Sequence, residues 1–348
     1  MKDYAVIRCL GLEQSFTKNH PYDRMAHVRT HRSTLALAGY AAILLAFRLG
    51  LEQSSIGREL GGHFRYAFAG FALLLAPMWF FGFGAGEWIR ERIRSRLLVM
   101  VLPAMLGFPY VIFALHAGNL HWPLAAAMFL LPTALAALLE FSRPPAKLSW
   151  QDCLALSVLV AAYMLHIFAG AWPFAGLAAL PKLYVADIAL YLYVVVRRLE
   201  GMGYSLVPRL SAILIGLREW LFFTPIGVGL GLALGFIHLH REMPSGTHAA
   251  AAVFVTFLLI AVPEELFFRG ILQNLLETRL RPCIALVIAS ALFGLSHFPK
   301  GAAFNWRYVL LATIAGVFYG RAWHARRQLL ASIVTHTAVD VVWSLWFR

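Results

Sequence analysis

The stretch 248–276 reads HAAAAVFVTFLLIAVPEELFFRGILQNLL, and it decides the fold class. It exceeds the about 20 mainly apolar residues that an α-helix needs to cross a bilayer core about 30 Å thick. Similar stretches recur along the chain, at about 34–51, 66–86, 97–116, 122–141, 153–172, 183–197, 211–237, 283–298, 308–323 and 328–347. The sequence therefore predicts an all-α polytopic transmembrane bundle of about ten or eleven segments, in which 183–197 is the doubtful one because it is short.

The composition excludes an ordinary soluble domain. Of the 348 residues 60% are hydrophobic and 14% charged, against about 45–50% and about 25% in soluble domains. The net charge of +13 would suggest nucleic acid in a soluble protein. Here most Lys and Arg fall in connections on one side of the membrane if the N-terminus is cytoplasmic, as the positive-inside rule requires. We therefore expect a lipid bilayer, and no nucleic acid, as the partner.

Three regions are expected. Residues 1–33 form a basic cytoplasmic tail that lacks the apolar core of a cleaved signal peptide. Residues 34–205 form an N-terminal transmembrane region of unknown role, and residues 206–348 a C-terminal core, because Gly, Pro and charges interrupt the apolar pattern near 199–210. The sequence indicates no oligomeric state. The cysteines are too widely spaced for a CxxC pair, so neither a disulfide framework nor a thiolate zinc site is predicted; they are Cys9, Cys153 and Cys283.

Ionisable residues inside apolar segments are concentrated in the last 140 or so positions, and such groups are functional candidates because a bilayer penalises them. Glu264 and Glu265 are adjacent, so their side chains point about 100° apart on a helix. Glu265 and Arg269 have the i, i+4 spacing of a helical ion pair. Glu264 is then expected to be the unpaired acid, suited to take a proton from water. Pro263 removes a backbone donor and favours a kink beside a cavity.

Two later segments carry imidazoles. Phe293 and His297 share one helical face, and Gly294 between them lets a neighbouring backbone approach closely. His336 and Asp340 share a face inside the last apolar segment. There an aspartate can fix the tautomer of the histidine, or both can bind a polar substrate group. Each pair taken alone is also compatible with a polar contact in the core.

Taken together and in this order, these motifs resemble the CPBP family, the CAAX-protease and bacteriocin-processing intramembrane proteases also called Abi. The family pattern EExxxR, FxxxH and HxxxN or HxxxD is matched by EELFFR at 264–269, FGLSH at 293–297 and HTAVD at 336–340. The resemblance covers about 210–348 and implies nothing specific for 1–200. It implies an intramembrane endopeptidase in a bacterial-type inner (plasma) membrane. The substrate would be a membrane-embedded or lipid-modified protein or peptide, prenylated or not.

The resemblance also implies roles for individual residues. Glu264 would be the base that activates water and His297 would assist it, while His336 with Asp340 would stabilise the oxyanion. Glu265 and Arg269, with Phe293, would hold the geometry of the site. Where prenyl-processing relatives have Asn in the last position, this chain has Asp340, and an ionised aspartate accepts hydrogen bonds but cannot donate to an oxyanion. Either Asp340 is protonated, or it orients His336, which then donates alone.

This mechanism needs one spatial arrangement, in which Glu264, His297 and His336 surround a shared water-filled cavity within the bilayer. Counting 1.5 Å per residue puts Glu264 and His336 in the cytoplasmic half. The same count puts His297 near the outer side, in conflict with that arrangement unless its helix tilts or starts deeper.

Other functions remain open at this stage. No cofactor is predicted for the glutamate mechanism. A zinc-dependent intramembrane protease is an alternative, because a catalytic zinc takes three protein ligands plus water. The candidate zinc ligands are Glu264, His297, His336 and Asp340. The motif HExxH is absent. A non-catalytic bacteriocin-immunity or scaffold protein is a second alternative. Transport would predict titratable groups spread along a path through both halves, whereas here they cluster in one.

Overall fold

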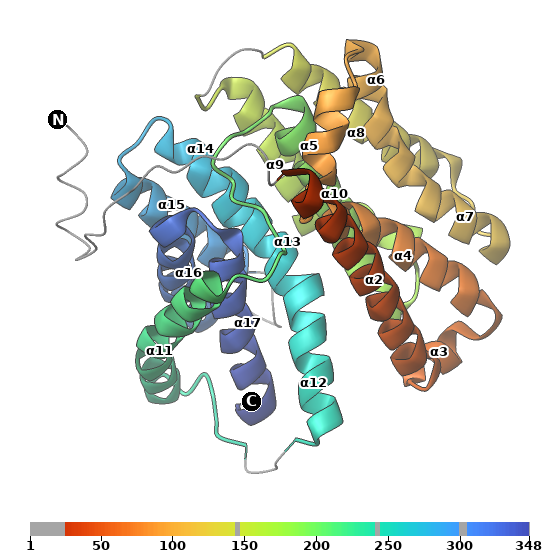
Figure 1. Cartoon of the computed structure of the whole chain (residues 1–348). Helices are drawn as coiled ribbons and strands as arrows, with labels where there is room; N and C mark the ends of the chain where they lie inside the picture. The colour runs from red at the N-terminus through yellow and green to blue at the C-terminus, as the bar shows by residue number, and fades with distance from the viewer. Residues whose placement is uncertain (1–24, 143–146, 241–243, 299–304, 348) are drawn as a thin grey trace.

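A computed structural model describes residues 25–142, 147–240, 244–298 and 305–347, and these residues form helices and connections without a β-strand (Figure 1). Of the predicted tail 1–33, residues 1–24 lie outside the described residues, as does Cys9. Helix α2 begins at Met25, so the first helix starts well before the apolar stretch that was predicted from residue 34. Cys153 and Cys283 are free thiols.

The helices of the N-terminal region are α2 (Met25–Glu52), α3 (Ser55–Leu60), η2 (Gly61–His63), α4 (Phe64–Phe81), α5 (Ala85–Arg92), α6 (Arg96–Val101), η3 (Leu102–Gly107), α7 (Phe108–Ala117), α8 (Trp122–Glu140), α9 (Trp150–Met164), η4 (Ala169–Ala171), η5 (Ala175–Leu177), α10 (Ala179–Tyr191) and η6 (Leu192–Val196). Those of the C-terminal region are α11 (Leu210–Ala233), α12 (Gly246–Val255), η7 (Thr256–Ala261), α13 (Val262–Glu265), η8 (Leu266–Gln273), α14 (Asn274–Glu277), α15 (Pro282–Leu295), α16 (Trp306–Arg326) and α17 (Leu329–Trp346).

Eight helical stretches of the described residues are long and apolar enough to cross a membrane. They are 32–52, 55–81, 96–117, 122–140, 175–196, 210–233, 246–277 and 329–346. Helices α9 and α15 are apolar but shorter, with 15 and 14 residues. The protein is thus an all-α, polytopic, integral membrane protein, as predicted, whereas a count of ten or eleven crossings stays a prediction.

Helix α10 with η6 is the central element of the N-terminal region. Of the apolar window in its span, 78% of the residues are buried inside the protein, the highest share among the eight spans. Every residue from Leu183 to Leu192 is buried. Its end is fixed by a buried ion pair in which Arg197 Nε lies 2.9 Å from Asp152 Oδ1 of α9. The segment that looked weakest in the sequence is therefore a rigid core helix.

The segment between η6 and α11 is irregular, as the Gly and Pro residues near 199–210 predict, but it is packed rather than loose. The carbonyl of Glu200 accepts a hydrogen bond from Asn274 of α14, and that of Met202 accepts one from Trp323 of α16. Gly203 has a φ of 66°, and an added Cβ there would meet the Arg327 carbonyl, so this backbone requires glycine. The two regions are joined along this segment.

The C-terminal region packs helices α11, α15, α16 and α17 against one another, and the long helix 246–277 lies between them and α10 (Figure 1). Small residues allow the close approaches. A Cβ on Gly294 of α15 would meet the Thr313 side chain and lie 2.6 Å from the Val309 carbonyl of α16. A Cβ on Gly216 of α11 would lie 2.6 Å from the Ala331 carbonyl of α17. The backbone approach predicted at Gly294 is confirmed.

The long helix 246–277 is not a regular α-helix. Its first turn is capped by Ser245, whose hydroxyl accepts from the His248 N–H. Two π-helical segments, η7 and η8, flank the single α-helical turn α13 that contains Pro263. Such wider turns are common at functional sites, because they redirect side chains and leave backbone groups displaced. The irregularity lies where the paired glutamates are.

Candidate active site

Glu265 and Arg269 form the predicted ion pair in the interior of the protein. Both side chains are fully buried, and Arg269 Nε lies 3.3 Å from Glu265 Oε2. Arg269 also donates to the carbonyl of Gly316 on α16 at 2.9 Å. Its guanidinium carbon lies 4.6 Å from the centre of the Phe293 ring on α15. The arginine therefore ties the helix of the glutamates to two neighbouring helices.

Carboxylate groups lie beside both ring nitrogens of His336. Its Nδ1 lies 2.7 Å from Glu265 Oε1, and because a carboxylate only accepts, Nδ1 carries the proton that is donated. Glu265 also accepts a hydrogen bond from the Ser332 hydroxyl, one turn before His336. The imidazole stacks on Tyr319 with ring centres 4.6 Å apart and planes within 14°. The ring is held in one orientation.

Asp340 lies on the other side of this imidazole. Its Oδ2 is 3.4 Å from His336 Nε2, the i, i+4 contact predicted from the sequence. Glu264 Oε2 is 3.8 Å from the same nitrogen. Asp340 is the most exposed of these acids, with 29% of its side chain accessible. The His336 imidazole therefore lies among three carboxylates.

His297 lies just after the end of α15 and is buried. Its Nδ1 is 2.9 Å from the Phe293 carbonyl oxygen, which can only accept, so Nδ1 donates and the neutral ring carries its lone pair on Nε2. The ring packs edge-on against Phe293 at 4.9 Å and Tyr308 at 4.7 Å. Helix α15 has only 14 residues, about 21 Å at 1.5 Å each, so it is shorter than a bilayer core about 30 Å thick. The depth of His297 in the membrane stays a prediction.

The expectation that Glu264 is unpaired is wrong. Lys182, near the start of α10, lies with its Nζ 2.6 Å from Glu264 Oε1. The exposed fractions of the two side chains are 17% and 12%. Lys182 stood in a connection in the predicted topology, 82 positions before Glu264, so no local pattern joined the two residues. The N-terminal region thus contributes directly to the site.

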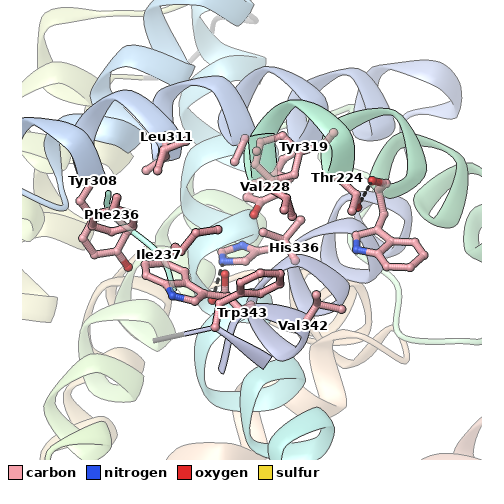
Figure 2. A pocket seen from close by; sticks show the side chains of 18 of the residues that line it. Thr224, Val228, Phe236, Ile237, Tyr308, Leu311, Tyr319, His336, Val342 and Trp343 are labelled. Atoms are coloured by element: carbon pink, nitrogen blue, oxygen red, sulfur yellow. Dashed lines mark hydrogen bonds and ion pairs between the residues drawn. The ribbon is translucent and has the colours of Figure 1, made fainter. Parts of the chain in front are cut away.

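The predicted shared cavity is found in part: His297 and His336 line one cavity, whereas Glu264, which lies next to His336, lines a second one. The first is lined by His297, His336 and Asp340 together with apolar and aromatic side chains. Figure 2 shows His336 and Tyr319 facing Tyr308 and Trp343 across it. The second is lined by Glu264 and Lys182 and by apolar residues of α9, α10 and η8. His336 lines the first cavity and Glu264 the second, with 3.8 Å between His336 Nε2 and Glu264 Oε2.

Sequence reasoning missed three residues of this site. Lys182, Ser332 and Tyr319 all contact a predicted residue. A lysine between apolar segments is a signal that could have been followed, because such a residue near the membrane interior is costly unless it is paired. Ser332 precedes His336 by one helical turn and could have been found by that spacing. Tyr319 carries no such signal in the sequence.

The arrangement of these side chains bears on whether the site can hold a metal ion. Within the described ranges, no group of three or more His, Cys, Asp or Glu side chains has the arrangement to hold a metal ion. The Nδ1–H of His336 donates a hydrogen bond to Glu265, and that of His297 donates one to the Phe293 carbonyl. A metal would therefore be limited to the Nε2 atom of each ring.

Part of the C-terminal region is similar to a known protein family. Residues 245–342 match the family model described as type II CAAX prenyl endopeptidase Rce1-like. The chain carries an Rce1-like CAAX protease domain. This domain contains all seven residues predicted for the site, from Glu264 to Asp340, and it supports an intramembrane protease activity. No curated protein and no solved structure matches the chain.

The match is narrower than the predicted core 206–348. The Rce1-like domain begins at the cap of α12 and ends within α17, so it excludes α11 and the whole N-terminal region. Trp220 and Thr224 of α11 nonetheless line the first cavity, and Lys182 lines the second. The surroundings of the site therefore extend beyond the Rce1-like domain.

Proposed function

We propose that this protein is an intramembrane endopeptidase that hydrolyses a peptide bond of a prenylated or otherwise lipid-modified protein or peptide, with water activated by Glu264. The observation that carries this proposal is the position of Glu264 and His336, with Oε2 and Nε2 3.8 Å apart and a cavity on either side. At this distance the base and the donor can both reach one water or carbonyl oxygen that lies beside them.

Glu264 has the role of the base. Its carboxylate takes a proton from a water molecule in the second cavity, and the hydroxide formed attacks the carbonyl carbon of the scissile bond. The proton then passes to the amine that leaves when the tetrahedral intermediate collapses. No covalent bond between protein and substrate is needed. His297, with its lone pair on Nε2 in the neutral ring, assists as a second proton acceptor from the first cavity.

His336 has the role of the oxyanion donor. Glu265 holds the proton on Nδ1, and Nε2 faces Glu264 and Asp340, an arrangement that suits the imidazolium form, in which both nitrogens donate. The Nε2–H then donates to the oxyanion as it forms. This assigns Asp340 the second of its two expected roles, the orientation of His336, and removes the need for a protonated aspartate.

The first cavity suits the apolar part of the substrate. Its walls are aromatic and aliphatic, with Phe223, Phe293, Leu311 and Trp343 among them, and it reaches His336 at one end. A lipid chain or apolar side chains placed there would hold the adjacent peptide bond at the imidazole. The description of the matched family as prenyl endopeptidases favours a prenyl chain.

The orientation in the membrane is also a proposal. Lys and Arg predominate in the connections that share a side with the N-terminus, so we place that side in the cytoplasm, in a bacterial-type inner membrane. Labelling of an engineered cysteine in the connection near residues 199–210, from either side of intact vesicles, tests this.

The proposed function is tested by reconstituting the full chain in liposomes with a fluorogenic farnesylated peptide and its unprenylated counterpart. Cleavage of the farnesylated peptide by the wild type, and at least about 1,000-fold slower cleavage by Glu264→Gln, supports the proposal. Glu140→Gln is the matched control, because Glu140 is also a buried glutamate near an arginine, with its Oε1 3.7 Å from Arg96 Nε, but lies in α8 outside the site. Full activity of Glu264→Gln overturns the role of Glu264, and no cleavage of either peptide favours an immunity or scaffold function.

A further inference from the structure

The ion pair between Lys182 and Glu264 joins a helix outside the Rce1-like domain to the acid proposed as the base. Lys182 Nζ lies 2.6 Å from Glu264 Oε1, a short charge-assisted hydrogen bond, and both side chains are largely buried. Residues 245–342 match the family, so the partner of Glu264 lies far outside the matched part of the chain.

We propose that Lys182 is a positioning residue of the proteolytic site, holding the Glu264 carboxylate so that it faces both its water and His336. This inference rests on the proposed function. The two oxygens of Glu264 have different neighbours, Oε1 at Lys182 and Oε2 at 3.8 Å from His336 Nε2. With Oε1 held by the lysine, rotation of the carboxylate is restricted and Oε2 stays directed at the imidazole.

The support for Lys182 is rigid, as a positioning role requires. Lys182 stands in the first turn of α10, and the residues that follow it are buried from Leu183 onwards. The other end of the same span is held by the ion pair between Arg197 and Asp152. Helix α10 also packs against α13 and η8, which carry Glu264 and Arg269. A shift of the backbone at Lys182 would therefore need a shift of the whole helix.

Lys182 also lies where water can reach the acid. It lines the second cavity with Glu264 and Tyr163, and it lines a further cavity whose wall includes Tyr163 and His166. An ammonium group has three N–H donors, and Glu264 Oε1 accepts one of them. The remaining donors can hold a water molecule beside the carboxylate. The lysine then places both the base and the water that the base deprotonates.

The test uses the full chain in liposomes with the farnesylated peptide and compares Lys182→Met with Lys182→Arg. We expect Lys182→Met to lower kcat by about 10- to 100-fold with KM changed by less than about threefold, because a misplaced base slows the reaction without weakening substrate binding. Lys182→Arg should recover most of this loss, since a guanidinium can also donate to Oε1. Arg48→Met is the matched control, because Arg48 forms an exposed ion pair with Glu52 on α2, away from the site, and should keep wild-type kcat.

Two results overturn the inference. One is a wild-type kcat for Lys182→Met, and the other is an equal loss in Lys182→Met and Lys182→Arg. If Lys182→Met does not fold, the comparison is made between Lys182→Arg and Lys182→Gln. The contact itself is tested without activity by cross-linking Lys182→Cys to Glu264→Cys with a short bis-thiosulfonate in a chain whose native cysteines are replaced. Absence of that cross-link in folded protein also overturns the inference.

The failure of this inference is distinguishable from that of the proposed function. If the wild type cleaves, Glu264→Gln does not, and Lys182→Met is unaffected, the proposed function stands and the role of Lys182 falls. If Glu264→Gln is fully active, the proposed role of Glu264 falls, and with it the reason for positioning that residue.

Discussion

Glu265 Oε1 lies 2.7 Å from His336 Nδ1, a contact between two buried residues 71 positions apart. It makes the second glutamate of the pair more than the partner of Arg269. One carboxylate oxygen accepts a hydrogen bond from the Nδ1–H of His336, and the other accepts one from Ser332 and lies against Arg269. A single side chain thereby links the long helix 246–277 to α17 and orients the imidazole of His336.

The first prediction concerns this link. Glu265→Gln keeps the shape of the side chain but removes the negative charge beside Nδ1 and can present an amide donor there, which disfavours the doubly protonated form of His336. We expect kcat to fall by at least about 100-fold, as when an aspartate that orients a catalytic histidine becomes asparagine. The stability of the fold should also fall, by about 3–5 kcal/mol, because Arg269 remains as a buried charge without its partner.

The measurements are steady-state kinetics per folded enzyme and the apparent Tm. Glu140→Gln serves again as a buried control outside the site, and its kcat should equal that of the wild type. Wild-type kcat in Glu265→Gln would show that Glu265 has no part in orienting the histidine.

The second prediction concerns Gly294. In Gly294→Ala the new Cβ meets Thr313 and lies 2.6 Å from the Val309 carbonyl, so α15 and α16 must separate. We expect a cost of about 1–3 kcal/mol in stability, together with reduced kcat, since His297 follows three residues later. Gly229→Ala is the control, because an added Cβ at this position in α11 meets no atom within 4 Å. Equal apparent Tm values for the two variants would contradict the close packing of α15 and α16.

The third prediction concerns the first cavity. Ala312→Leu places a larger side chain in its wall, where Ala312 is buried beside Leu311. The prenyl chain would then bury about two fewer methylene groups in the cavity. Because this weakens binding, KM should rise about tenfold for the farnesylated peptide. A geranylgeranylated peptide should lose more, and the unprenylated peptide little. An equal change in KM for all three peptides would exclude the cavity as the lipid site.

The fourth prediction concerns metal dependence. For a glutamate-activated water we expect cleavage by the wild type to continue after prolonged treatment with a strong chelator. The measurement is the initial rate of cleavage before chelation, after chelation, and again after zinc is added back. Loss of activity that zinc restores would support the alternative, in which Glu264, His297, His336 and Asp340 supply the ligands.

Much of this fold follows from the sequence, because long apolar helices leave a clear signal in a chain that must satisfy its backbone inside lipid. The stretch 248–276 was identified by length and composition alone. The i, i+4 contacts of Glu265 with Arg269 and of His336 with Asp340 followed from helical spacing. The π-helical segments around Pro263 did not, since they depend on tertiary packing rather than on a residue pattern.

The contacts between distant residues could not be predicted. Spacing within a helix says nothing about which face of another helix it meets, so the contact of His336 with Glu265 rather than with Asp340 alone was not foreseen. Lys182 was assigned to a connection because its neighbours looked like the start of a weak segment. The helical span there is in fact 175–196, with 22 residues, so it begins before the apolar stretch at 183–197 and includes Lys182.

The central position of α10 has a practical consequence for protein engineering. A fragment cut to the boundaries of the family match would lack α10, so Glu264 would lose its ion pair with Lys182. The proteolytic centre should therefore be transferred together with α10, whether it is moved to another scaffold or exchanged between homologous enzymes. A chimera of two parent proteins should be active only if α10 and the helix 246–277 come from the same parent.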